Sequence, residues 1–340
     1  MKKVRFGVIG TNFISDWMIC GARQDSRFEL TAVCSRHSET AEAFAVKHHI
    51  PHVFTSVEEM ARSPFIDAVY IASPNFLHAE QSILCMKYGK HVLCEKPLAS
   101  NAKEVRRMIE ASAKYQVTLM EAMKPTLTPN FRSLMNNLGR VGTIRRYFSA
   151  YCQYSSRYDK LKEGIMSNAF NLDCSNGAVM DIGVYTIYPM VVLFGMPHET
   201  LASGTILASG TDGQGSVIFR YDGMEASVLY SKISDSDLPT EIQGESGTIT
   251  LNRINQIEKV SYTPHMTNLS GGKRQCVRIE NLTENSDHDE YYYEMAEFIN
   301  LVLSGKCQSV INSHENSLHT MMLVDEIRRQ LGVSFPADKQ

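Results

Sequence analysis

The strongest constraint on the fold of this chain is a regular alternation in its first 120 residues. Short, continuously apolar stretches alternate there with stretches of helical periodicity. Strands that are apolar throughout are typical of sheets covered on both faces, and strict strand–helix alternation predicts a parallel sheet with right-handed crossovers. Strands are expected at Val4–Ile9, Phe28–Cys34, His52–Phe54, Ala68–Ile71, His91–Cys94 and Val117–Glu121, and helices at Phe13–Ala22, Thr40–His48, Leu77–Tyr88 and Ala102–Tyr115, with one more beginning at the capping box of Ser56 and Glu59.

The pattern changes after about residue 122. Expected strands follow one another there without helices between them, which predicts an α+β arrangement on a largely antiparallel sheet. We therefore expect an α/β domain over 1–122 and an α+β domain over 123–340. In the second half, strands are expected at Ile144–Tyr154, Leu201–Ala208, Ser216–Tyr221, Ala226–Ile233, Glu241–Leu251, Ile257–Tyr262 and Gln275–Ile279, hairpin turns at 210–215 and 268–273, and helices at Asp181–Phe194, Glu290–Leu303 and Glu315–Leu331, the last with Ser313 as N-cap.

Composition fits two globular domains and excludes secreted, fibrous, disordered and membrane-spanning classes. The chain has 340 residues, of which 43% are hydrophobic and 21% are charged. Its net charge of −3 argues against non-specific binding to nucleic acid or to an anionic membrane. No apolar run approaches the roughly 20 residues that span a bilayer. The eight cysteines are scattered, and the histidines lack metal-ligand spacing, so we expect reduced thiols, a cytoplasmic location and no metal site.

A glycine-containing turn follows the first expected strand. Gly10 takes the first position of the pattern G-x-G-x-x-G, whereas Asn12 and Ser15 replace the other two glycines. Between a strand and a helix this pattern is typical of dinucleotide binding, because backbone amides and the helix N-terminus attract a pyrophosphate. Asn tolerates a left-handed backbone better than other non-glycine residues do, so we expect the tight turn to survive. The cofactor contacts expected here are Gly10, Thr11, Asn12, Phe13 and Ile14.

The residues that follow the second strand favour one of the two nicotinamide dinucleotides. An acidic residue at this place would bind the ribose 2′-hydroxyl of NAD. The chain instead has Ser35 and Arg36, and a hydroxyl with a guanidinium suits a 2′-phosphate better. We therefore expect NADP as the cofactor, and NAD stays open.

Three further motifs lie at strand ends or before a helix. They are Ser73-Pro74-Asn75-x-x-His78, Glu95-Lys96-Pro97 and Asp181-x-Gly183-x-Tyr185. In this order after the glycine turn, the set resembles the glucose–fructose oxidoreductase / inositol dehydrogenase / rhizopine catabolism (Gfo/Idh/MocA) family. The resemblance covers essentially the whole chain. It implies an N-terminal Rossmann domain and a C-terminal α+β domain that carries the substrate site and supports a homodimer or higher homo-oligomer.

The last two motifs also make chemical sense together. Asp181 and Tyr185 are spaced i and i+4, so they share one helix face. Hydride transfer from a secondary alcohol needs a group that takes the hydroxyl proton, and Tyr185 suits this role if a cation such as Lys96 lowers its pKa. Asp181 accepts a hydrogen bond from a substrate hydroxyl or positions Tyr185. By resemblance, Lys96, Asp181 and Tyr185 are the family's catalytic positions; many members have His in place of Tyr185, and dihydrodiol dehydrogenases have Tyr.

Further residues are expected around this core of the site. Ser73, Pro74 and Asn75 shape the nicotinamide pocket, and Glu95 orients Lys96. His78 either contacts the nicotinamide ribose or caps its helix. Lys124 meets the cofactor or the substrate. The segment 154–171 lacks a regular period and is expected as a loop that covers the substrate, with Arg157, Tyr158 and Asn171, beside Asp181, as its recognition residues.

These observations predict an NAD(P)-dependent oxidoreductase. It should transfer a hydride between the nicotinamide and a secondary hydroxyl or carbonyl of a sugar, polyol or diol. Two alternatives remain: a glycoside hydrolase-like enzyme that retains its NAD, and a regulator that senses the cofactor. The intact set of Lys96, Asp181 and Tyr185 argues against the regulator.

Overall fold

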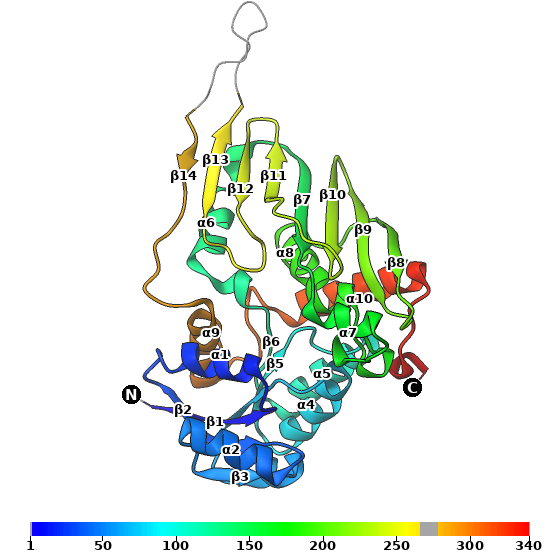
Figure 1. The fold of residues 1–340 in the computed structure, drawn as a ribbon. Helices are drawn as coiled ribbons and strands as arrows, with labels where there is room; N and C mark the ends of the chain where they lie inside the picture. Colours follow the sequence, from blue (N-terminus) through cyan, green and yellow to red (C-terminus); the bar gives the residue numbers. More distant parts are fainter. Residues whose placement is uncertain (1, 266–277, 340) are drawn as a thin grey trace, which may run out of the picture.

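The N-terminal part of the molecule is built on a parallel sheet. The computed structural model describes residues 2–265 and 278–339. The sheet has six strands in the order β3-β2-β1-β4-β5-β6, which confirms the expected parallel arrangement (Figure 1). The first four strands have the expected bounds, whereas β5 and β6 each end one residue later. They are β1 (Val4–Ile9), β2 (Phe28–Cys34), β3 (His52–Phe54), β4 (Ala68–Ile71), β5 (His91–Glu95) and β6 (Leu119–Ala122).

Helices cover both faces of this sheet, as the continuously apolar strands require. On one face α3, α4 and α5 share a core with Val69, Ile71 and Val92. On the other face α1 and α2 pack against Phe6 and Tyr70. These helices are α1 (Phe13–Ala22), α2 (Ser38–His48), α3 (Val57–Arg62), α4 (His78–Lys87) and α5 (Ala102–Tyr115).

A helix from near the C-terminus completes the second face. In α9 (Glu290–Ser304), Met295, Phe298 and Ile299 belong to the same buried core as the residues of α1 and α2. The ring centroids of Phe6 and Phe298 are 5.9 Å apart, and α9 lies beside α1 (Figure 1). The parallel sheet therefore depends on a segment far downstream of residue 122, and the proposed division into 1–122 and 123–340 stays a prediction.

The second part of the molecule contains a mixed sheet of eight strands. Their order is β14-β13-β12-β11-β7-β10-β9-β8. Only β7 and β10 pair in parallel among these described strands, so the expectation of a largely antiparallel sheet is confirmed. The strands are β7 (Ile144–Cys152), β8 (Glu199–Ile206), β9 (Asp212–Tyr221), β10 (Met224–Ser231), β11 (Thr240–Gly244), β12 (Gly247–Leu251), β13 (Val260–Pro264) and β14 (Glu280–Asn281).

Three expectations in this sheet need correction or lie outside the described residues. The single strand expected over Glu241–Leu251 is a hairpin of β11 and β12, because the chain turns between Gly244 and Gly247. The turn expected over 210–215 ends early, since β9 already begins at Asp212. The turn at 268–273 and most of the strand expected at Gln275–Ile279 fall outside the described residues, and β14 begins at Glu280.

Helices pack between the mixed sheet and the parallel sheet. The long helix α10 (His314–Leu331) contacts β8, α8 and α5, and its predicted N-cap is confirmed because the Ser313 hydroxyl accepts the Asn316 N–H at 3.1 Å. The helix α8 (Val184–Phe194) starts later than expected, since a π-helical turn over Val179–Gly183 precedes it.

Two short helices were not expected from the sequence. One is α6 (Pro129–Asn137). The other, α7 (Ser156–Lys162), forms inside the segment expected as a loop, where the Ser155 hydroxyl accepts the Arg157 N–H at 3.3 Å.

One helical segment, Leu172–Phe194, is apolar and long enough to cross a membrane by length and composition, contrary to the expectation from the sequence. However, 72% of its most apolar window is buried inside the protein. A core helix passes the same test, and the packing of α8 against β7 and β10 is the packing of a core helix.

The role of α9 can be tested with Phe298→Ala. Truncating a buried phenylalanine to alanine costs about 3–5 kcal/mol, and we expect the free energy of unfolding to fall by about this amount in urea titrations. Val46→Ala on the exposed side of α2 is the control, with an expected change within about 0.5 kcal/mol. An unchanged unfolding transition of the parallel-sheet part in Phe298→Ala, monitored by Trp17 fluorescence, would contradict this role.

Candidate active site

The carboxyl ends of the parallel strands open into a cleft of about 1370 Å³. Gly10, Ser35, Ser73 and Glu95 line it from that side. Residues of the mixed sheet and its loops line the other side, among them Tyr151 and Gln153 of the β7 end, Lys232 and Arg253. Ligands of open α/β sheets bind at such strand ends, so this cleft is the candidate active site.

The glycine turn at the start of α1 has the backbone that a phosphate site needs. Gly10 has φ +104°, and a Cβ on it would lie 2.6 Å from the carbonyl oxygen of Ala72. The expectation for Asn12 is wrong, because its backbone is extended (φ −90°) and not left-handed. Its side chain instead caps α1: the amide oxygen accepts the N–H groups of Ile14 and Ser15 at 2.9 and 3.3 Å, and the amide nitrogen donates to Ala72 at 2.7 Å.

This arrangement fits a dinucleotide pyrophosphate. In the described part of the chain, the amides of Thr11, Asn12 and Phe13 make no hydrogen bond, so they remain available at the N-terminus of α1. The small, buried Ser15 donates to the Gly10 carbonyl at 2.8 Å and keeps the helix close to the strand. All five residues expected to contact the cofactor at this turn line the cleft: Gly10, Thr11, Asn12, Phe13 and Ile14.

Ser35 and Arg36 also line the cleft, at the end of β2. The Ser35 hydroxyl lies 2.7 Å from the Thr40 hydroxyl, and the Ser35 amide donates to the Phe54 carbonyl. Arg36 takes part in no ion pair with the residues that the structure describes. A guanidinium without a protein carboxylate beside it is suited to a phosphate.

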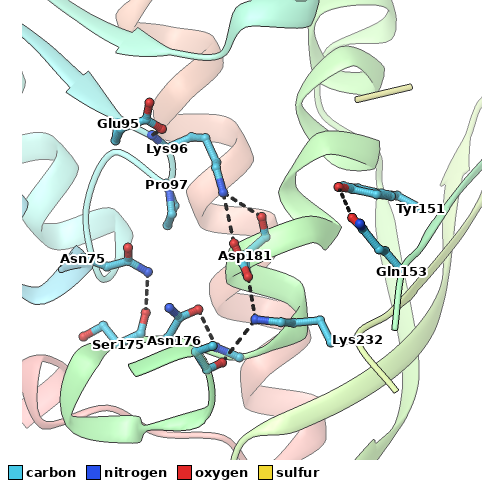
Figure 2. Close-up of polar contacts among 12 residues, drawn as sticks. Asn75, Glu95, Lys96, Pro97, Tyr151, Gln153, Ser175, Asn176, Asp181 and Lys232 are labelled. Atoms are coloured by element: carbon cyan, nitrogen blue, oxygen red, sulfur yellow. Dashed lines mark hydrogen bonds and ion pairs between the residues drawn. The ribbon is translucent and has the colours of Figure 1, made fainter. Parts of the chain in front are cut away.

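A cluster of three charged side chains joins the two sides of the cleft (Figure 2). The Lys96 ammonium donates to the backbone oxygen of Asp181 at 2.8 Å and to Oδ1 of its carboxylate at 3.1 Å. The Lys232 ammonium donates to Oδ2 of the same carboxylate at 2.5 Å. Lys96 follows β5, Asp181 lies in the π-helical turn, and Lys232 follows β10. The cluster therefore holds one carboxylate between two ammonium groups from different sheets.

Asp181 and Lys96 keep their charges at neutral pH. Burial by itself raises the pKa of Asp181, but the charges of Lys232 and Lys96 outweigh burial and hold the pKa below its usual range. Burial by itself lowers the pKa of Lys96, but the carboxylates of Asp181 and Glu95 raise it above its usual value. Asp181 is therefore an anion and Lys96 a cation, as their expected roles require.

Tyr185 lies beside this cluster, but not in the way expected. The Lys96 Nζ is 5.0 Å from the centroid of the Tyr185 ring, and the Tyr151 ring meets it edge-on at 5.7 Å. Burial, together with the nearby Glu95, Tyr151 and Asp181, raises the pKa of Tyr185 well above 10. The expectation that Lys96 lowers this pKa is wrong, because the ammonium faces the ring and is bonded to Asp181. Tyr185 is a protonated phenol at neutral pH.

His78 and Asn75 tie segments of the site together. The buried His78 ring lies 2.9 Å from the Pro97 carbonyl and 2.8 Å from the Ser73 carbonyl, and burial lowers its pKa. His78 and Asn75 line the cleft, as do Ser73 and Pro74. The Asn75 side-chain amide donates to the Ser175 carbonyl at 2.9 Å, which links the parallel-sheet side of the cleft to the segment before α8 (Figure 2).

Glu95 and Lys124 line the cleft, and both side chains also bind other groups of the protein. Glu95 accepts hydrogen bonds from the Tyr70 hydroxyl and from the backbone N–H of Lys96, the latter at 3.2 Å, so it contacts the main chain of Lys96 rather than its ammonium. Lys124 is paired with Glu290, and its ammonium lies 5.0 Å from the centroid of the Tyr291 ring. Burial lowers the pKa of Lys124 to about 8.

The expected substrate residues are only partly brought together. Arg157 lines the cleft from α7, and its guanidinium lies 5.8 Å from the centroid of the Phe13 ring. Tyr158 and Asn171 are not among the described residues that line it: Tyr158 packs on Tyr154 and Phe170, and the Asn171 amide oxygen accepts the N–H of Asp173 at 3.0 Å. Tyr158 and Asn171 therefore lie apart from the described lining of the cleft, and their substrate contacts stay a prediction.

Sequence reasoning missed Lys232, although the sequence carried a signal for it. In the strand predicted over Ala226–Ile233, the side chains at Ala226, Val228 and Tyr230 are buried, and Lys232 continues that same period of two. A lysine at a core-facing strand position needs a buried partner. The cleft residues Tyr151, Gln153, Asn176, Asp235 and Arg253 had no comparable signal.

The described residues contain no group of three or more His, Cys, Asp and Glu side chains arranged to hold a metal ion.

Comparison with known proteins identifies the class to which this fold and site belong. Residues 4–123 match the family model described as "Oxidoreductase family, NAD-binding Rossmann fold", and residues 135–250 match the "GFO/IDH/MocA C-terminal domain". The chain therefore belongs to the Gfo/Idh/MocA family, and it is an NAD(P)-dependent oxidoreductase.

Individual relatives support this membership over the whole chain. The chain is 48% identical over 336 residues, 99% of both chains, to the "scyllo-inositol 2-dehydrogenase (NADP(+)) IolU" of Bacillus subtilis (strain 168). It is 31% identical over 320 residues, 91% of both chains, to the "Trans-1,2-dihydrobenzene-1,2-diol dehydrogenase" of Xenopus laevis. The structure of KijD10, a 3-ketoreductase from Actinomadura kijaniata in complex with NADP and TDP-benzene, matches with a TM-score of 0.81 at 23% identity, covering 96% of this chain and 98% of that one, and it shows the shared fold.

Proposed function

We propose that this protein is an NADP(H)-dependent dehydrogenase that interconverts a secondary hydroxyl of a cyclic polyol and the corresponding ketone. The observation that carries the proposal is the meeting of Lys96, Asp181 and Tyr185 in the cleft that the glycine turn also lines. The 48% identity to an enzyme named for scyllo-inositol and NADP(+) supports an inositol-like substrate. A homo-oligomer and a cytoplasmic location belong to the proposal as sequence-based expectations.

The residues of the parallel-sheet side fit the cofactor. The open amides of Thr11 to Phe13 would hold the pyrophosphate, and Ser35 and Arg36 would hold a 2′-phosphate. The bound nicotinamide supplies the hydride acceptor or donor. The chain supplies the handling of the proton and of the charge on the substrate oxygen.

Tyr185 is the proposed acid and base. Because its pKa lies well above 10, its hydroxyl is protonated through neutral pH and can donate to a substrate carbonyl oxygen in the reductive direction. In the oxidative direction the phenol must first release its proton to solvent, after which the phenolate oxygen accepts the proton of the substrate hydroxyl. The cluster of Lys96, Asp181 and Lys232 has a net charge of +1, which stabilises negative charge developing on the substrate oxygen. The side of Asp181 that faces the cleft can accept a hydrogen bond from a second hydroxyl.

Turnover assays test the proposal directly. Purified protein should reduce NADP⁺ with scyllo-inositol and related cyclic polyols, with net formation of NADPH. Sustained formation of NADPH would also exclude both a regulator and an enzyme that retains its nucleotide. No oxidation of any inositol isomer or trans-diol in the presence of NADP⁺ or NAD⁺ would contradict the proposed function.

Tyr185→Phe tests the acid–base role. Losing the proton donor should lower kcat roughly 10²–10⁴-fold, while the affinity for NADPH stays nearly unchanged. Because wild-type Tyr185 is protonated throughout, the ratio of mutant to wild-type rates of ketone reduction should stay constant from about pH 6 to about pH 9. Tyr151→Phe is the matched control, since its hydroxyl is bonded to Gln153 in the same cleft. Full activity of Tyr185→Phe, or a ratio that rises above about pH 8, would remove this assignment.

Arg36→Ala tests the preference for NADP. A hydrogen bond to a charged group contributes about 1.5–3 kcal/mol, so NADPH binding should weaken at least about tenfold while NADH binding changes little. Quenching of Trp17, which lines the cleft, reports both titrations. Arg23→Ala removes the same charge from the far end of α1 and should leave both affinities unchanged. Equal losses for the two cofactors in Arg36→Ala would exclude a contact to the 2′-phosphate.

A further inference from the structure

Lys232 is a buried lysine whose ammonium is bonded to the protein. Its side chain is 4% exposed. It follows β10 directly, and its backbone N–H donates to the Gly213 carbonyl at 2.8 Å, so the main chain at this point is fixed by β9. The residue lines the cleft, and its ammonium is bonded to the Asp181 carboxylate there.

Its ammonium makes two hydrogen bonds and one ring contact with the protein. The ammonium donates to Asp181 Oδ2 at 2.5 Å and to the Ala169 carbonyl at 3.3 Å. Its remaining side faces the Phe170 ring, with the nitrogen 4.8 Å from the ring centroid. Among the described residues, the Lys96 ammonium hydrogen-bonds only to Asp181, and it lies against the ring of Tyr185. The polar contact of Lys232 with the catalytic residues is therefore its bond to Asp181.

We propose that Lys232 is a positioning residue for the hydride-transfer reaction: it holds the Asp181 carboxylate in the ionised form and in one orientation, so that the carboxylate in turn holds the Lys96 ammonium against Tyr185. This inference rests on the proposed function of the site. The contact geometry carries it, because one carboxylate oxygen binds each lysine and a rotation of the carboxylate would break both bonds.

Several other groups face this cluster from the elements packed around it. Glu95 of β5, Tyr151 of β7 and Tyr185 of α8 lie on the Lys96 side. On the Lys232 side lies Asp212 of β9, whose pKa the charge of Lys232 lowers against the larger effect of burial. The Asp212 carboxylate accepts the Val179 N–H at 2.7 Å, at the start of the π-helical turn. Tyr230 of β10 lies next to Asp212. The Lys232 variants are therefore also measured in an Asp181→Asn background. A pH effect that disappears in this background belongs to Asp181, and one that persists belongs to Asp212.

Removing the Lys232 charge should shift the pH dependence of the enzyme in a defined direction. An adjacent opposite charge lowers the pKa of a carboxyl by about 1–3 units, so Lys232→Met should move the titration of Asp181 up by this amount. The carboxylate would then be lost at a higher pH as the solution is acidified. Because the pKa of Asp181 lies below its usual range in the wild type, the acidic loss of kcat that it sets should move up by about 1–3 pH units, into the ordinary carboxyl range below about pH 4. In addition, kcat should fall about 10–100-fold, as for the loss of partners that orient a reacting group, with little change in KM.

The experiment compares Lys232→Met and Lys232→Gln with Lys232→Arg. Gln keeps a hydrogen-bond donor without charge, so it separates the charge from the bond and also serves if the Met variant does not fold. Arg keeps the charge, so Lys232→Arg should return the acidic limb of kcat to nearly its wild-type pH. Lys90→Met is the matched control, because the Lys90 ammonium is bonded to two backbone carbonyls, of Ser63 and Ile66, in the parallel-sheet part. It should leave the pH profile of kcat unchanged.

A second readout does not depend on turnover. A folded-state pKa held low stabilises the protein above the unfolded-state pKa, and this stabilisation is lost as the pH falls through the folded-state pKa. In Lys232→Met the folded-state pKa of Asp181 rises towards the ordinary carboxyl range, so the deficit in urea midpoint should be full at about pH 7 and should shrink only below about pH 4. With Asp181→Asn as the background this loss below about pH 4 should be absent, and only the contribution of Asp212, whose pKa burial raises to about 6, should remain.

The outcomes separate this inference from the proposed function. A shifted acidic limb in Lys232→Met and Lys232→Gln, with rescue by Lys232→Arg, supports the positioning role. An unshifted limb, or a urea deficit that has the same pH dependence in both backgrounds, overturns it. If the wild-type protein turned over no polyol, the proposed function would fail, while the urea measurements would still decide whether Lys232 sets the charge of Asp181.

Discussion

The carboxylate of Asp181 is the point on which the two halves of the site depend. Lys96 reaches it from the end of β5 in the parallel sheet, and Lys232 reaches it from the end of β10 in the mixed sheet. A lone carboxylate at this depth would be costly, and so would two neighbouring ammonium groups without it. Each charge is tolerated because of the others, so the cluster fixes the relation between the strand ends that line the cofactor side and the helix that carries Tyr185.

The first half of the fold could be predicted from the sequence because its strands are apolar on both faces. That pattern requires helices on both sides, and the alternation of strands and helices supplies them in order. The packing of α9 on the α1 and α2 face of this sheet was not predictable in the same way. The sequence from residue 290 onward indicates an amphipathic helix, but it does not indicate which surface that helix packs against. Local sequence predicts the element, whereas its packing partner is a long-range property.

The site shows the same division between local and long-range information. The motifs that contain Gly10, Lys96, Asp181 and Tyr185 lie at strand and helix ends, and topology alone brings such ends to one cleft. The backbone of Asn12 was predicted wrongly because a lost glycine suggested a left-handed replacement, whereas the side chain caps α1 from an extended backbone. Lys232 was missed because its partner lies 51 positions earlier in the chain, and only the period of β10 indicated that it faces inward.

The site places a phenol that can serve as the acid beside a cluster with a net positive charge. A residue that must donate a proton to a carbonyl oxygen has to be protonated at the start, and a raised pKa achieves this over the whole neutral range. The usual difficulty of such a weak acid is that its anion is unstable once the proton has left. The net positive charge of Lys96, Asp181 and Lys232 acts instead on the substrate oxygen, where it favours the negative charge that develops during the reaction. The cluster stabilises this charge in both directions of the reaction, and Asp181 and Lys96 do so without changing protonation.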